Sequence, residues 1–247
     1  MIVLLAKALT FDGMLSLQNF ANLAGRGDRE LLNISVWQAT LNTLRNVAIS
    51  ATIAVGLGLL VSYLLSRTHR TRRAKFSNRT LDLLFLIPVG ISSVVLGFGY
   101  LITFGGGPLP LRSSWLVVPI VQALMALPLV IRLIYPALIS IGSEHREAAS
   151  LAGANSRQTW WHIESGIIRN VILTAIGFAL IAGIGEFGAA SLLAFGDQAT
   201  LPTVLFALIS RTGALNYGMA MAVCAILIVL TFVLVFSVSA QRPRRRR

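Results

Sequence analysis

The chain has 247 residues, of which 55% are hydrophobic and only 12% are charged, and its mean hydropathy is +0.77. This composition is too apolar for a water-soluble domain of this length and predicts an integral membrane protein. The formal net charge of +12 would also suit a nucleic-acid-binding protein. The sequence lacks the interleaved basic and aromatic residues of such surfaces, so we expect no nucleic-acid partner.

The amino terminus begins with an apolar stretch, Met1 to Leu9, that is about half as long as a membrane span. It lacks the basic flank and the small-residue cleavage site of a signal peptide. A mixed polar stretch over residues 10–45 follows and is expected to lie outside the cell. We therefore interpret residues 1–39 as the remnant of a truncated first span and an external segment. A late start codon, a missing preceding half and a short interfacial anchor all remain open.

Five later segments are long and apolar enough to cross a bilayer, which takes roughly 20 residues in a helix. None alternates with the period of two expected of barrel strands. The predicted fold is all-α and integral to the membrane, with about five transmembrane helices over residues 40–238 and a basic tail over residues 239–247. The predicted spans are Val47 to Leu65, Leu81 to Phe104, Trp115 to about Ile141, Ile167 to about Phe195, and Gly218 to Val238.

Basic residues gather on one side of these predicted spans. They lie between the first two spans, after the third and after the fifth, whereas the opposite loops between spans hold only Arg112 and Arg211. By the positive-inside rule the basic side is cytoplasmic, so the chain is expected to end in the cytosol. The tail Arg244 to Arg247 is also suited to contact anionic lipid headgroups.

The polar interval between the third and fourth spans, Ser143 to Ala154, has the pattern of a short helix with a defined end. Residues 144–152 favour a helix, and Gly153 is suited to ending it. Asn155 or Ser156 can then cap a second helix that starts near Arg157. The interval therefore predicts a helix, a turn and a helix on the cytoplasmic face, available to a partner from the water side.

Glu186 is an ionisable residue inside the fourth predicted span, where charge is costly and usually faces a bundle interior or a wet cavity. Small residues surround it, so backbones are expected to approach closely there and the helix is expected to bend. Two interpretations stay open at this point. Glu186 either caps or pairs at a packed helix break, or it contacts a transported solute.

Enzymatic chemistry has little support in the sequence. Gly183, Gly185 and Gly188 match a dinucleotide-binding pattern, but they lie in an apolar run with no preceding strand. We find no phosphate-binding loop of the Walker type, no metalloprotease-like histidine spacing, and a single cysteine, Cys224. We therefore expect no catalytic residues, no metal site and no cofactor on this chain.

The interval around Gly153 resembles a known motif. Glu147, Ala148 and Ala149, followed by Gly153, are similar to the EAA loop of permease subunits in binding-protein-dependent ABC importers of type I. The run Ala126 to Arg132 resembles the span that leads into that loop. The run Gly185 to Ala189 resembles a segment of the branch that serves thiamine, ferric iron, sulfate and molybdate. One departure is Ser165 and Gly166, where the family often has Leu and Pro.

This resemblance implies a transport subunit rather than an enzyme, in the bacterial plasma membrane. It implies as partners a dimer of cytoplasmic ATPases, an external substrate-binding protein, membrane lipid, and a second permease half or a second copy. If a preceding half is missing, this chain would be the carboxyl-terminal half of a fused permease. Thiamine or ferric iron is the expected solute, because an acidic residue on the path favours a cation.

The resemblance also implies roles for individual residues. The loop would transmit force from the ATPases, and the segment around Glu186 would lie near the solute pathway or its outer gate. The residues implied in coupling are Glu147, Ala148, Ala149 and Gly153, and those implied in the pathway or gate are Glu186 and Phe187. A channel or an ion-coupled secondary transporter is the alternative, but it would not need the cytoplasmic helix, turn and helix. A membrane-embedded scaffold is a weaker third hypothesis.

Overall fold

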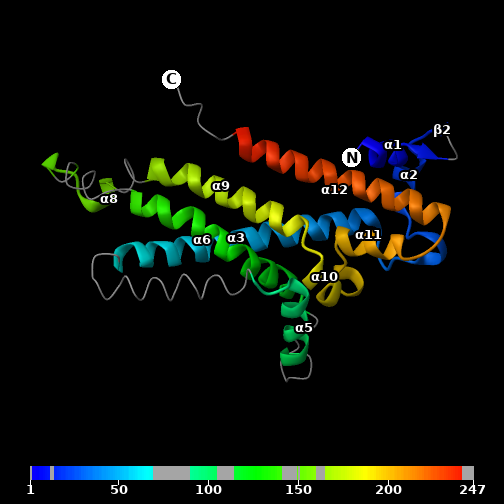
Figure 1. The fold of residues 1–247 in the computed structure, drawn as a ribbon, viewed down its shortest axis with the longest axis horizontal. Helices are drawn as coiled ribbons and strands as arrows, with labels where there is room; N and C mark the ends of the chain where they lie inside the picture. Colours follow the sequence, from blue (N-terminus) through cyan, green and yellow to red (C-terminus); the bar gives the residue numbers. More distant parts are fainter. Residues whose placement is uncertain are drawn as a thin grey trace.

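A computed structural model describes residues 2–11, 14–68, 90–104, 114–140, 149, 151–159 and 165–240. The described part is almost entirely helical, which confirms the predicted all-α fold. Four long helices, α3, α6, α9 and α12, run side by side along the long axis of the molecule (Figure 1). They are Val36–Thr68, Val117–Ser140, Ser165–Ile184 and Ala214–Ala240, respectively.

Shorter elements lie at the ends and flank of this bundle. α5 (Ser93–Phe104) projects from it beside α10 (Gly188–Leu193), and α11 (Leu201–Ile209) packs on α3 and α12 (Figure 1). The 3-10 helix η5 (Gly196–Gln198) joins α10 to α11, and α8 (Ser156–Thr159) lies at the opposite end of the bundle.

The amino-terminal segment packs against the start of α12. It comprises α1 (Ile2–Ala8), the two-residue strands β1 (Thr10–Phe11) and β2 (Met14–Leu15), α2 (Gln18–Ala21), η1 (Asn22–Ala24) and η2 (Asp28–Glu30). The strands are antiparallel, with Thr10 opposite Leu15. Asn19 is buried and its Nδ2 donates to the carbonyl oxygens of Ala8, at 3.1 Å, and Thr10, at 3.0 Å. This side chain therefore ties the end of α1 to the hairpin.

The predicted spans correspond to helices, but the fourth span is split into two helices and the first helix begins earlier than predicted. Among the described residues, three helices are long and apolar enough to cross a membrane, namely α3, α6 and α12, and α5 and α9 are shorter apolar helices. The predicted fourth span is two helices, since α9 ends at Ile184 and α10 begins at Gly188. Of the predicted second span, residues 81–89 lie outside the described part.

The first long helix begins earlier than predicted. α3 starts at Val36, whereas the apolar pattern indicated Val47, and residues 36–45 were expected to belong to a polar external stretch. The reason is that the polar residues of this first part are packed against protein. Asn42 and Thr43 are buried against the segment around η5 and α11, so they form helix without being apolar.

Buried side chains form three clusters along the molecule. One joins the amino-terminal segment to α11 and the start of α12, around Leu23, Leu201 and Met219. A second fills the space between α3, α6 and α9, and the third packs α10 against the start of α6. The outer face of α12 is left apolar and exposed, with Phe232 and Phe236 each 65% exposed. Such a face is suited to lipid or to another membrane subunit.

Candidate functional site

The break between α9 and α10 is organised by Glu186. One carboxylate oxygen accepts a hydrogen bond of 2.8 Å from the backbone N–H of Ala189, and the other accepts one of 3.2 Å from Ala190. Both donors belong to the first turn of α10, whose N–H groups have no partner within the helix. A negative charge also interacts favourably with this end of a helix. These contacts match the interpretation of Glu186 as a cap at a helix break; contact with a solute stays a prediction.

Glycines allow α10 to lie close to α5. A Cβ atom added at Gly188 would overlap the Ser93 side chain and would lie 3.0 Å from the backbone nitrogen of Val94. On the facing helix, a Cβ added at Gly97 would lie 3.2 Å from Cα of Ala189. The predicted close approach of backbones around Glu186 is therefore present, and it is made with α5.

The other gate candidate, Phe187, also has a defined contact. Its ring lies 5.3 Å from the ring of Phe206 on α11, centroid to centroid, with the two planes tilted by 47°. Aromatic pairs at this separation attract one another. The residue beside the Glu186 cap therefore links the helix break to α11.

A row of polar side chains on α3 binds the segment that connects α10 to α11. Nδ2 of Asn42 donates to the carbonyl oxygens of Asp197, at 2.7 Å, and Ala199, at 3.1 Å. Nη2 of Arg45 donates to Oε1 of Gln198 at 2.6 Å. The Arg45 guanidinium also lies 5.0 Å from the ring centroid of Trp115, in the turn just before α6, in a cation–π contact.

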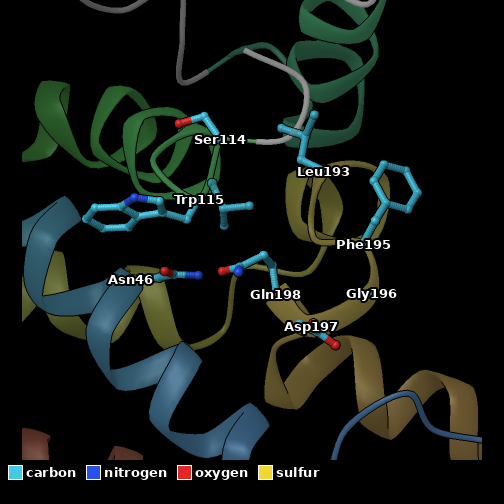
Figure 2. A pocket seen from close by; sticks show the side chains of 9 residues that line it. Asn46, Ser114, Trp115, Leu193, Phe195, Gly196, Asp197 and Gln198 are labelled. Carbon is cyan, nitrogen blue, oxygen red and sulfur yellow. The ribbon is translucent and has the colours of Figure 1, made fainter. Parts of the chain in front are cut away.

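A cavity of about 580 Å³ lies beside this row of contacts (Figure 2). Its polar wall contains Asn46, on the same helix as Arg45, and Gln198 of η5, whose amide groups point toward one another. Trp115 and several apolar side chains form the remaining wall. The full lining is Asn46, Ser114, Trp115, Val118, Leu193, Phe195, Gly196, Asp197 and Gln198.

Asn46 is the most deeply buried polar residue of this cavity, with 1% of its surface exposed. Its Oδ1 atom is buried and has no hydrogen-bond partner among the described residues. Sequence reasoning missed this residue together with Arg45, Trp115 and Gln198. The available signal was the polar run just before Val47, which was assigned to the external polar stretch because the Gln198 partner of Arg45 lies 153 residues further along the chain.

The predicted stop and restart after the third span are present where the structure describes them. Gly153 has φ of +79°, and the backbone N–H of Ala154 donates to the carbonyl oxygen of Ala149 at 2.9 Å, a contact typical of a helix end. Asn155 then caps α8, because its Oδ1 accepts from the backbone N–H of Gln158 at 2.9 Å. Oε1 of Gln158 accepts in return from the N–H of Asn155, also at 2.9 Å.

Of the four residues implied in coupling, two are described. Ala149 is buried and Gly153 is exposed, with nothing within 4 Å of a Cβ placed on it. Glu147 and Ala148 lie outside the described residues. α8 lies at the end of the bundle opposite α1 and α11, so this loop and the cavity near Asn46 are in different halves of the molecule (Figure 1).

Comparison with known families and proteins gives one consistent result. The model of the family "binding-protein-dependent transport system inner membrane component" matches residues 54–247. The ferric transport system permease protein FbpB of Actinobacillus pleuropneumoniae is 23% identical over 224 residues, which cover 91% of this chain and 31% of that protein. The sulfate transport system permease protein CysW of Escherichia coli K12 is 28% identical over 248 residues, covering 95% of this chain and 79% of the relative.

A solved structure has the same fold. It is a bacterial ABC transporter involved in the import of the acidic polysaccharide alginate, and the matched chain superposes with a TM-score of 0.65 at 15% sequence identity. The match covers 96% of this chain and 88% of the matched one. The chain thus spans most of a transporter subunit of this fold but only 31% of the length of the ferric relative.

Proposed function

This chain belongs to the family of inner membrane components of binding-protein-dependent transport systems, and we propose that it is the permease subunit that moves a small inorganic ion inward by alternating access. The family and the apolar helices make it a multi-pass membrane protein. Its relatives are transport permeases, which supports a role as a transport subunit. ATP hydrolysis belongs to a separate cytoplasmic ATPase in this proposal.

The observation that carries the proposal is the ordered stop and restart at Gly153 and Asn155. A loop that only connected two spans would not need a left-handed residue followed by a reciprocal cap. Such a rigid turn can transmit displacement from a partner to α6 and α9, which flank it. We propose that the loop, with Glu147, Ala148 and Ala149, sits in a cleft of the ATPase on the cytoplasmic side, the side on which the carboxyl terminus also lies.

The remaining partners follow from the same assignment. An external substrate-binding protein delivers the ion to the end of the bundle near the amino-terminal segment. A second permease half or a second copy of this chain completes the pathway. Lipid covers exposed apolar faces such as that of α12, where Phe232 and Phe236 project.

The names of the relatives bear on the choice of solute, whereas Glu186 does not. The two relatives compared are named for ferric iron and sulfate, and neither for thiamine. Glu186 had favoured a cation, but both of its oxygens accept hydrogen bonds from α10. It therefore gives no reason to prefer a cation over an anion. We propose that Glu186 and Phe187 serve as an outer gate by holding α10 and α11 in position.

The experiment that tests the proposed function is copurification of the ATPase encoded with this chain. We expect Gly153→Asp to abolish ATPase copurification and ATP-dependent uptake, because it puts a charge and a side chain on the exposed turn. Asn33→Asp adds the same charge at the opposite end of the bundle, on an exposed residue, and should behave as wild type. Wild-type copurification and uptake in Gly153→Asp would refute the coupling role.

The gate is tested separately by solute-stimulated ATPase activity in the assembled transporter. Phe187→Leu removes the aromatic contact with Phe206 while leaving the Glu186 cap in place. We expect a higher basal ATPase rate and weaker stimulation by the loaded binding protein. Stimulation equal to that of the wild type would remove Phe187 from the gate.

A further inference from the structure

Arg45 on α3 carries a positive charge that no carboxylate of the described residues balances. Its Nη2 donates to Oε1 of Gln198 at 2.6 Å and its guanidinium lies 5.0 Å from the ring centroid of Trp115, and both of these partners are uncharged. Figure 2 shows the carboxylate of Asp197 pointing away from Gln198. A guanidinium has five N–H donors, so most of them remain for another acceptor. Arg45 is exposed, and that acceptor can therefore come from outside the chain.

The position of Arg45 along α3 corresponds to a layer of lipid headgroups. The stretch of α3 between Arg45 and Arg67 holds no charged residue, and the two arginines are 22 residues apart. At about 1.5 Å per residue this separation is about 33 Å. The hydrocarbon core of a bilayer is roughly 30 Å thick, so the two arginines reach opposite headgroup layers. Trp115, which contacts Arg45 just before α6, is of a residue type enriched in that layer.

The face of α3 that continues from Arg45 into the span is suited to acyl chains. Ala48, Thr52 and Leu60 follow on this face at helical spacing, and all three are exposed. The Thr52 hydroxyl donates to the carbonyl oxygen of Ala48 at 2.8 Å, so this polar group is satisfied without water. A cation at the end of such a face favours an anionic lipid over a soluble anion, because the lipid adds apolar contact to the charge attraction.

We propose that Arg45 and Trp115 form a binding site for the headgroup of an anionic phospholipid, in the leaflet opposite the basic tail. The remaining guanidinium N–H groups donate to the phosphate oxygens. Gln198 and the Trp115 ring hold the guanidinium plane in place, so little side-chain freedom is lost when the lipid binds. A zwitterionic headgroup carries its own cation and is attracted less. The proposed function enters only in making this leaflet the outer one, since it puts the carboxyl terminus in the cytosol.

The test is native mass spectrometry of the assembled permease and ATPase complex in micelles with equal amounts of phosphatidylglycerol and phosphatidylcholine. We expect the wild type to retain phosphatidylglycerol in preference. Arg45→Gln should reduce this preference by about fivefold, the effect of one basic residue near anionic lipid. Arg45→Lys keeps the charge without the planar set of donors and should retain part of the preference. Arg211→Gln is the matched control, because it removes the same charge from another exposed position.

Thermal unfolding of the same complex gives a second measurement. A lipid that binds only the folded protein raises the unfolding midpoint by mass action. We expect phosphatidylglycerol to raise the midpoint of the wild type and of Arg211→Gln more than that of Arg45→Gln. Equal preference for phosphatidylglycerol in the wild type and Arg45→Gln, or displacement of the lipid by inorganic phosphate, would overturn the lipid site. ATPase copurification in these samples reports on the proposed function, so the two proposals can fail separately.

Discussion

Thr43 of α3 accepts a hydrogen bond of 2.8 Å at Oγ1 from the backbone N–H of Leu201, the first residue of α11. Both residues are buried, and Oγ1 of Thr43 also donates to the carbonyl oxygen of Ala39. The first N–H groups of a helix have no acceptor within that helix. Oγ1 of Thr43 on α3 therefore provides the acceptor that the Leu201 N–H lacks within α11. With the two bonds of Asn42, this contact fixes the segment that forms the wall of the cavity.

Removing this hydroxyl should destabilise the protein. Thr43→Val keeps the shape of the side chain but leaves the Leu201 N–H buried and unpaired, which costs about 1–3 kcal/mol. We expect a lower midpoint of thermal unfolding in detergent, whereas Thr43→Ser, which keeps the hydroxyl, should lose much less. Equal unfolding midpoints for the Val and Ser variants would show that the hydrogen bond contributes nothing.

Substitutions at Glu186 should weaken the cap of α10 by graded amounts. Glu186→Gln keeps one oxygen that can accept from Ala189 but loses the charge, and Glu186→Leu loses every acceptor. Loss of a cap costs about 0.5–2 kcal/mol. We expect the Leu variant to increase amide hydrogen exchange in α10, with a smaller increase in the Gln variant. Exchange in α12, which does not depend on the cap, serves as the internal control.

The residues that sequence reasoning found and those that it missed differ in the range of their interactions. Gly153 and Asn155 act on neighbours within five residues, so their roles can be read from residue type and spacing. The contact of Arg45 with Gln198 spans 153 residues and depends on how α3 meets η5. The same reason explains the start of α3, because hydropathy counts Asn42 as polar whether water or another part of the chain surrounds it.

Gly188 should tolerate no larger side chain. An added Cβ atom would meet both the Ser93 side chain and the backbone of Val94, and a backbone cannot move aside cheaply. We expect Gly188→Val to separate α10 from α5 and to reduce the yield of folded protein in membranes. Gly99→Val on α5 is the control, since nothing lies within 4 Å of a Cβ there. Similar yields for the two variants would contradict close packing at Gly188.

Removing the reciprocal cap at Asn155 should cause a local loss of order in the coupling loop. Asn155→Ala removes the acceptor for the Gln158 N–H and should destabilise α8 by about 1 kcal/mol. We expect lower efficiency of coupling, measured as solute moved per ATP hydrolysed, with insertion into the membrane unchanged. Asn155→Asp keeps the acceptor and should retain most of the coupling. Identical coupling in the Ala and Asp variants would rule out the cap as the relevant feature.

The contact between Asn19 and Gly218 predicts a compensating pair of substitutions. A Cβ atom at Gly218 would overlap Oδ1 of Asn19, so Gly218→Ala should push the amino-terminal segment away from α12. We expect faster amide hydrogen exchange in α1 and α2 in this variant. Asn19→Ala removes the overlapping atom. Adding Gly218→Ala to Asn19→Ala should therefore raise the exchange rate of α1 and α2 little further, and a double-mutant cycle measures this coupling between the two positions. Gly56→Ala, where nothing lies within 4 Å of the added Cβ, controls for the loss of a helical glycine. Additive effects of the two substitutions would show that the segment is not seated on Gly218.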